Sequence, residues 1–98
     1  MLNKTKDYDV IRTEERLEDK HHYLYELLMR RGETVACWRM PLYSIRVKMT
    51  DAYGNKRSAD AIDIFSDEDK ALSFFEKLVR NLATPIDLPY VLEDEMLG

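Results

Sequence analysis

The sequence of 98 residues contains little cysteine, glycine or proline, with one, three and three residues respectively. A single cysteine, Cys37, excludes an internal disulfide framework and fits a reducing compartment. No apolar run approaches the roughly 18 residues that a membrane-spanning helix needs. The first six residues lead into charged residues and not into the apolar core of a signal peptide. We therefore expect a cytoplasmic protein without membrane association.

The composition is that of one small globular domain. Hydrophobic residues make up 45% of the chain and charged residues 35%, which is typical of a chain that folds around a core. The length leaves no room for a second domain, so residues 1–98 are treated as one unit. Residues 1–6 are expected to form a flexible tail.

Charge is unevenly distributed along the chain. The net charge is −4, but residues 21–57 carry +4 and residues 58–98 carry −7. The acidic total disfavours a dedicated duplex-DNA binder, because phosphate contacts dominate that affinity. A local contact with RNA stays open. The basic middle and the acidic end could attract each other within the fold, across a dimer or toward a partner.

Three segments in the first half of the chain have the pattern of strands. Residues 7–19 are ambiguous, because their second half favours a helix by propensity while Tyr8 and Val10 alternate as in a strand. We favour an edge strand there. Residues 21–31 are aromatic-rich and are expected to form a strand. A short apolar strand is expected at residues 34–39, where a following proline ends it.

Residues 43–50 and 56–65 are expected to form a hairpin around a turn at 51–55. Its register is left open by the pattern. If Arg46 pairs with Asp60, two isoleucines near the end of the second strand point away from the core. Burying them requires a one-residue shift or a β-bulge, and we favour the bulge. The two residues are Ile62 and Ile64.

Two helices are expected after the strands. Residues 67–82 show apolar side chains at helical spacing, with Ser66 as the N-cap and Thr84-Pro85 as the stop. A short second helix is expected at residues 88–97. Its apolar side is formed by Leu88, Val91, Leu92 and Met96.

Together these elements predict an α+β fold. A mostly antiparallel sheet of about four strands in meander order is followed by one amphipathic helix and a short C-terminal helix packed on the sheet. An aromatic-rich sheet with an exposed face or edge also favours pairing with a second copy. A homodimer is therefore one expected assembly.

No complete catalytic or cofactor-binding motif is visible in the sequence. Adjacent His21 and His22 would point to opposite faces of a strand and could not share a metal ion. Cys37 would act as a nucleophile only beside a base, and a cysteine in an apolar strand is more often simply buried. Ser66–Asp69 lacks the glycine and glutamate of a calcium loop, so helix capping explains it better. We expect no cofactor, no metal and no enzymatic activity. The enzymatic alternative is a site around His21, His22 and Asp63 assembled across a dimer.

Basic residues interleaved with aromatic residues form the one candidate nucleic-acid surface. Single-stranded RNA readers combine such cations with stacking rings. The alternative is a solvated strand face with salt bridges to Asp60 and Asp63, and Tyr43 falls on the apolar side of its strand. The cations are Arg30, Arg31, Arg39, Arg46, Lys48, Lys56 and Arg57, and the rings are Trp38, Tyr43 and Tyr53.

The second helix is a candidate docking motif, because it is apolar on one side and acidic on the other. The alternative is that it folds back to cover its own sheet. With the basic hairpin, this helix supplies the candidate partner-binding residues. They are Arg46, Lys48, Lys56, Arg57, Glu93, Asp94 and Glu95.

Three motifs in the second half follow one another in a recognisable order. They are Tyr43–Ile45 in a strand, Ile62–Asp67 running into a helix, and Thr84-Pro85-Ile86-x-Leu88 followed by Val91–Asp94. Over a little more than half of the chain, they resemble a family of short uncharacterised bacterial proteins with a domain of unknown function. The resemblance implies an α+β fold and a cytoplasmic location. It implies no reaction, since the family has no assigned activity.

These observations predict a small non-enzymatic cytoplasmic interaction protein that binds a protein partner or itself. The alternative function is an RNA-contacting regulator that uses the basic β-hairpin.

Overall fold

Four antiparallel strands form one sheet in the order β1-β2-β3-β4, as the meander prediction requires. The computed structural model describes residues 8–31 and 41–97, so the predicted tail at 1–6 and the predicted strand at 34–39 lie outside the described residues. The ambiguous first segment is a strand. The strands are β1 (Asp9–Glu18), β2 (His21–Arg31), β3 (Pro41–Thr50) and β4 (Lys56–Phe65).

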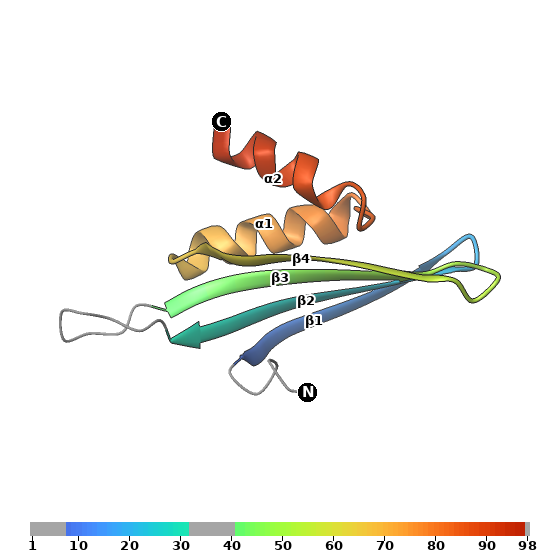
Figure 1. Cartoon of the computed structure of the whole chain (residues 1–98), viewed down its shortest axis with the longest axis horizontal. Coiled ribbons are helices and arrows are strands. Elements are labelled where there is room, and N and C mark those ends of the chain that lie inside the picture. Colours follow the sequence, from blue (N-terminus) through green and yellow to red (C-terminus); the bar gives the residue numbers. More distant parts are fainter. Residues whose placement is uncertain (1–7, 32–40, 98) are drawn as a thin grey trace.

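Both helices lie on one side of the sheet (Figure 1). They are α1 (Glu68–Arg80), which contacts β2, β3 and β4, and α2 (Leu88–Leu97), which contacts β4 and α1. The predicted α+β fold, with four strands followed by two helices, is confirmed. The β1–β2 and β3–β4 turns come together at one end of the sheet and extend past the helices (Figure 1).

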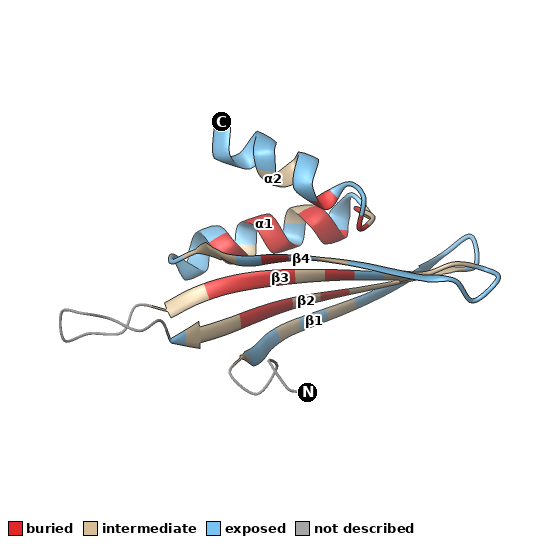
Figure 2. Cartoon of the chain, in the orientation of Figure 1, coloured by how far each residue is buried: buried red, intermediate tan, exposed pale blue. Residues whose placement is uncertain are grey.

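The core forms between α1 and the sheet face that it covers (Figure 2). Strand alternation places Tyr25, Leu27, Tyr43, Ile45 and Val47 on this face, so the prediction that Tyr43 belongs to the core is confirmed. α1 contributes the side chains that its spacing predicted. They are Ala71, Phe74, Phe75, Leu78 and Val79.

One long-range hydrogen bond joins the sheet to the connection between the helices. The buried Tyr25 hydroxyl donates to the carbonyl oxygen of Ala83 at 2.9 Å. Ala83 is itself buried, so the bond satisfies a backbone acceptor that water does not reach. It fixes the point where the chain turns from α1 toward α2.

The ends of α1 differ from the prediction by one or two residues. The N-cap is Asp67 and not Ser66, because the Asp67 carboxylate accepts the backbone N–H of Asp69 at 3.1 Å. α1 ends at Arg80, before the predicted stop at Thr84-Pro85. Leu82 takes the left-handed conformation, with φ 50°. The N–H groups that follow the helix then bond back to carbonyls of its last turn, in the pattern of a Schellman motif.

Thr84 begins the turn that leads into α2 and does not stop α1. The Asp87 carboxylate accepts the Thr84 N–H at 3.0 Å, and the Thr84 hydroxyl accepts the Asp87 N–H at 3.3 Å. This reciprocal pair has the arrangement of a capping box. Pro85, which has no N–H to lose, fits the first turn.

The predicted β-bulge is present in the β3–β4 hairpin. Ile45 pairs with Ala61 and Tyr43 with Phe65, so three residues of β4 lie opposite Ser44. Asp63, in the middle of the bulge, has φ 53°. The bulge packs Ile64 against the core but leaves Ile62 exposed. The expectation that the bulge buries both isoleucines is therefore wrong for Ile62.

Candidate functional site

The sheet face opposite the helices carries a row of ion pairs. Glu26, Arg46 and Asp60 are neighbours across β2, β3 and β4. The Arg46 Nε donates to Asp60 at 3.0 Å, and its Nη1 lies 3.9 Å from Glu26. Lys48 Nζ lies 3.8 Å from the same Glu26 oxygen. The predicted salt bridge to Asp60 is therefore confirmed, and it engages Arg46 within the sheet.

A second polar cluster closes the bulge. Arg30 of β2 donates to both carboxylate oxygens of Asp63, with Nε at 3.1 Å from Oδ1. The backbone N–H of Asp63 donates to the Ser44 hydroxyl at 2.8 Å, and Ser44 is fully buried. The hydrogen bond to Asp63 raises the pKa of the Arg30 guanidinium. The predicted bridge to Asp63 is confirmed, and its geometry supports the bulge.

The histidines do not join Asp63 within one chain. His22 pairs with Thr50 in the sheet, whereas Asp63 lies opposite Ser44. Six residues of strand separate the two positions by roughly 20 Å. The His21 ring nitrogen Nδ1 lies 2.9 Å from the Asp19 carbonyl oxygen, and His22 lies 3.3 Å from the Glu15 carboxylate.

The other candidate sites are a metal site, a calcium-binding loop and a reactive cysteine. Within residues 8–31 and 41–97, no three His, Cys, Asp or Glu side chains gather in a way that could hold a metal ion. Ser66–Asp69 forms the start of α1, with Asp67 as its cap. Cys37, Trp38 and Arg39 lie outside the described residues.

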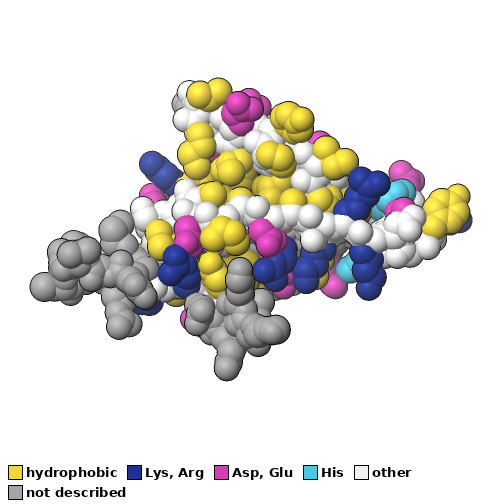
Figure 3. Space-filling view, viewed as in Figure 1, with side chains coloured by type: hydrophobic (Ala, Val, Ile, Leu, Met, Phe, Trp, Pro, Cys, Tyr) yellow, Lys and Arg dark blue, Asp and Glu magenta, His cyan; other side chains and the backbone are white. Residues whose placement is uncertain are grey.

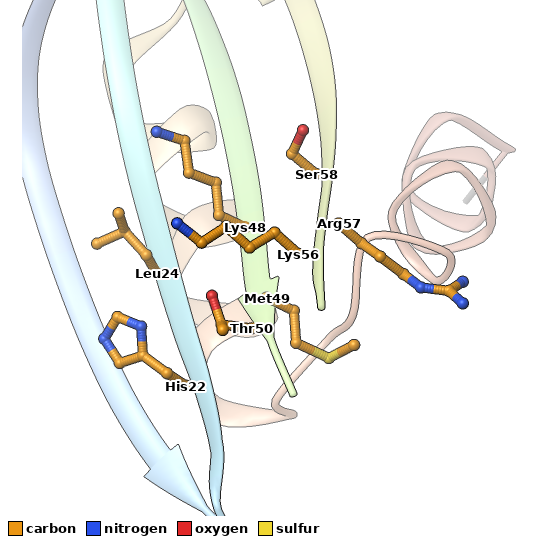
Figure 4. Close-up of a pocket in the computed structure, with 8 residues that line it drawn as sticks. All are labelled: His22, Leu24, Lys48, Met49, Thr50, Lys56, Arg57 and Ser58. Atoms are coloured by element: carbon orange, nitrogen blue, oxygen red, sulfur yellow. The ribbon is translucent and has the colours of Figure 1, made fainter. Parts of the chain in front are cut away.

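An open groove of about 490 Å³ lies at the end of the sheet where the two turns meet. Lys48, Lys56 and Leu24 gather on one side of the strands, whereas Arg57 points to the other side (Figure 4). No carboxylate is among the described residues that line the groove. The lining consists of His22, Leu24, Lys48, Met49, Thr50, Lys56, Arg57 and Ser58.

The turn beside this groove is held by one aspartate. Asp51 Oδ1 accepts the backbone N–H groups of Tyr53 and Asn55, each at 2.9 Å, and Oδ2 accepts the Asn55 side-chain amide at 3.0 Å. The bonds from Asn55 lower the pKa of the Asp51 carboxyl. Gly54 adopts φ 87°, which only glycine adopts without strain. Tyr53 is 90% exposed on this ordered turn.

A shallow groove of about 340 Å³ between β1 and α1 was not anticipated from the sequence. Arg12 lies 5.8 Å from the centre of the Phe75 ring and 3.7 Å from the Glu76 carboxylate. A hydrogen bond from Arg16 lowers the pKa of the Glu14 carboxyl. The alternation of Arg12, Glu14 and Arg16 along β1 was the available signal, since every second residue shares a face.

α2 presents apolar and acidic side chains together. Within α2 only Leu88 is buried, and Figure 3 shows apolar side chains spread over the upper part of the molecule, where α2 lies. Met96, which the sequence places on the apolar side of the helix, is exposed, because α2 meets α1 and β4 mainly near its first turns. Val91 and Leu92 are half-buried. Glu93, Asp94 and Glu95 are exposed.

The fold and these surfaces define a small α+β domain with a four-stranded meander and both helices on one side of it. The chain belongs to DUF6514, a family of unknown function, whose pattern matches residues 7–97. The predicted likeness to a family without assigned activity is thus confirmed at that level. Bacterial origin and the diagnostic value of the Thr84–Leu88 motif stay predictions. Neither the curated proteins nor the solved structures gave a match. In the part of the chain that the structure describes, no helix is long and apolar enough to cross a membrane.

Proposed function

We propose that this protein is a small non-enzymatic cytoplasmic interaction protein that binds another protein, or a second copy of itself, through α2. The observation that carries the proposal is the exposure of apolar side chains on this helix. Tyr90 and Leu97 are 67% and 80% exposed, whereas Leu88 alone is buried. Burying one such side chain stabilises by about 1.5–3 kcal/mol. Apolar patches with a polar rim are typical of protein interfaces.

The acidic rim indicates the chemistry of the partner. Glu93, Asp94 and Glu95 follow one another on α2, and Lys77 of α1 lies 3.6 Å from Glu95. Rim charges steer association and select the partner. We therefore expect a surface that combines an apolar centre with lysine or arginine at its edge.

The pairing of Asp63 supports the non-enzymatic part of the proposal. The enzymatic alternative brings the histidines to Asp63 across a dimer, but within each chain the Asp63 carboxylate is already engaged by Arg30 and lies far from His22. His22 itself contacts Glu15.

The proposal is tested with tagged full-length baits in native lysate, treated with nuclease and read by mass spectrometry. An untagged copy is expressed alongside so that self-association is also detected. The wild-type bait should recover a stoichiometric protein, and the Tyr90→Glu/Leu97→Glu bait should lose it. A control bait, Leu17→Glu/Tyr53→Glu, makes the same charge change at exposed apolar residues on other elements and should retain it. Equal recovery by all three baits would refute a role for α2.

The second candidate function, an RNA-contacting regulator that uses the basic hairpin, is favoured by a different observation. The groove at the hairpin end is lined by cations and by no described carboxylate.

A further inference from the structure

The end of the sheet carries two cations that no described carboxylate engages. Lys56 and Arg57 are exposed and form no ion pair with the described residues. Lys48 keeps only a distant contact of 3.8 Å with Glu26. Lys48 and Lys56 both reach over the groove (Figure 4), and Thr50 and Ser58 add hydroxyl groups to its lining. This lining favours an anionic ligand, although the whole chain is acidic.

An exposed aromatic ring lies on the turn that joins the two strands of this groove. Tyr53 lies between Thr50 and Lys56 in the sequence, and both of these residues line the groove. The bonds to Asp51 order the backbone of the turn before any ligand binds, so less entropy is lost on binding. A tyrosine held in this way has both faces of its ring available for stacking.

We propose that the hairpin end binds single-stranded RNA, with Tyr53 stacked against a base and Lys48 and Lys56 contacting phosphates. The proposal deepens the second candidate function and uses a surface separate from α2. Phosphates next to unstacked bases are the ligand that a cationic groove beside a ring recognises. A duplex hides its base faces, and its affinity depends on many more phosphate contacts than two lysines supply.

Two exposed lysines provide a matched pair of variants. Lys56 lines the groove, whereas Lys70 is exposed in the first turn of α1, which begins at the end of the sheet away from the two turns (Figure 1). Lys56→Glu should therefore weaken RNA binding, whereas Lys70→Glu makes the same charge change away from the groove.

The experiment measures the fluorescence anisotropy of a labelled oligouridylate of 12 nucleotides with the full-length protein at 50 and 200 mM salt. We expect saturable binding with Kd below about 100 μM at 50 mM salt, weakening as salt rises. Lys56→Glu should weaken binding about tenfold, because one phosphate contact is lost, and Lys70→Glu should change it less than about twofold. Tyr53→Ala should weaken binding about tenfold and Tyr53→Phe should not, since stacking needs the ring and not the hydroxyl.

Several results would overturn the proposal. They are the absence of saturable binding at 50 mM salt, equal losses in Lys56→Glu and Lys70→Glu, and unchanged binding in Tyr53→Ala. Salt-sensitive dimerisation that Lys56→Glu abolishes, without RNA binding, would assign the groove to an acidic protein segment instead. The Tyr90→Glu/Leu97→Glu variant should bind the RNA normally. Failure of the α2 proposal and failure of the RNA proposal are therefore distinguishable.

Discussion

Tyr25 links the sheet to the helices through a single hydroxyl group. Replacing it with phenylalanine keeps the ring in the core but leaves the buried Ala83 carbonyl without its 2.9 Å partner. We expect Tyr25→Phe to lower the free energy of unfolding by about 1–2 kcal/mol, measured by urea denaturation. Tyr90→Phe changes an exposed ring and should leave stability unchanged. Equal stability of the Tyr25→Phe variant and the wild type would contradict a structural role for the bond.

The same residue predicts how stability depends on pH. Burial raises the pKa of the Tyr25 hydroxyl above its ordinary value of 10, so the folded state holds this proton more tightly than the unfolded chain. Stability from this group is fully present below pH 10 and falls as pH rises above about 10, with a slope near 1.4 kcal/mol per pH unit. Urea unfolding between pH 9 and 11 should therefore show a smaller decline in Tyr25→Phe than in the wild type. Parallel declines would contradict the prediction.

At the scale of elements, the bulge in β4 depends on one buried serine. Ser44 accepts the Asp63 N–H at 2.8 Å at the point where three residues lie opposite one. Ser44→Ala removes the acceptor at small cost in volume. We expect a loss of about 1–2 kcal/mol in the free energy of unfolding. Ser58→Ala, at an exposed position of the same sheet, serves as the control and should lie within about 0.5 kcal/mol of the wild type. A similar small effect at Ser44 would show that the bulge needs no such support.

Periodicity predicted the elements because one face of each is buried. The alternation in 43–50 and the helical spacing in 67–82 are recovered in β3 and α1. The short connections predicted the meander. The first segment was ambiguous for the same reason. Charged residues lie on both faces of β1, so no apolar face identified it as a strand.

The remaining features depend on contacts that periodicity does not encode. The N-cap is Asp67 and not the predicted Ser66. Either side chain can cap a helix, and the choice depends on backbone geometry. Ile62 is exposed because the bulge changes the side-chain direction in only part of β4. Among the candidate residues, the structure brings Lys48, Lys56 and Arg57 to the lining of one groove. It engages Arg46 in ion pairs. Such grouping requires strand register, which the sequence left open.

At the scale of the whole molecule, α2 is attached by its first turn and exposes its last. Leu88 is 1% exposed, whereas residues 93–97 are all exposed. Leu88→Ala should therefore lower the free energy of unfolding by about 2–4 kcal/mol, measured by urea denaturation. Ending the chain after Leu92 should lower it by less than about 1 kcal/mol, because the truncation removes no buried side chain. A large loss on truncation would assign the last turns of α2 to the fold.

We propose that the exposed end of α2 binds protein. Co-purification tests this with a tagged bait that ends after Leu92, beside the full-length bait and in the same lysate. We predict that the truncated chain is folded and fails to recover the protein, or the second copy, that the full-length chain recovers. Undiminished recovery of the same partner by the folded, truncated bait would show that the last turns of α2 do not bind it.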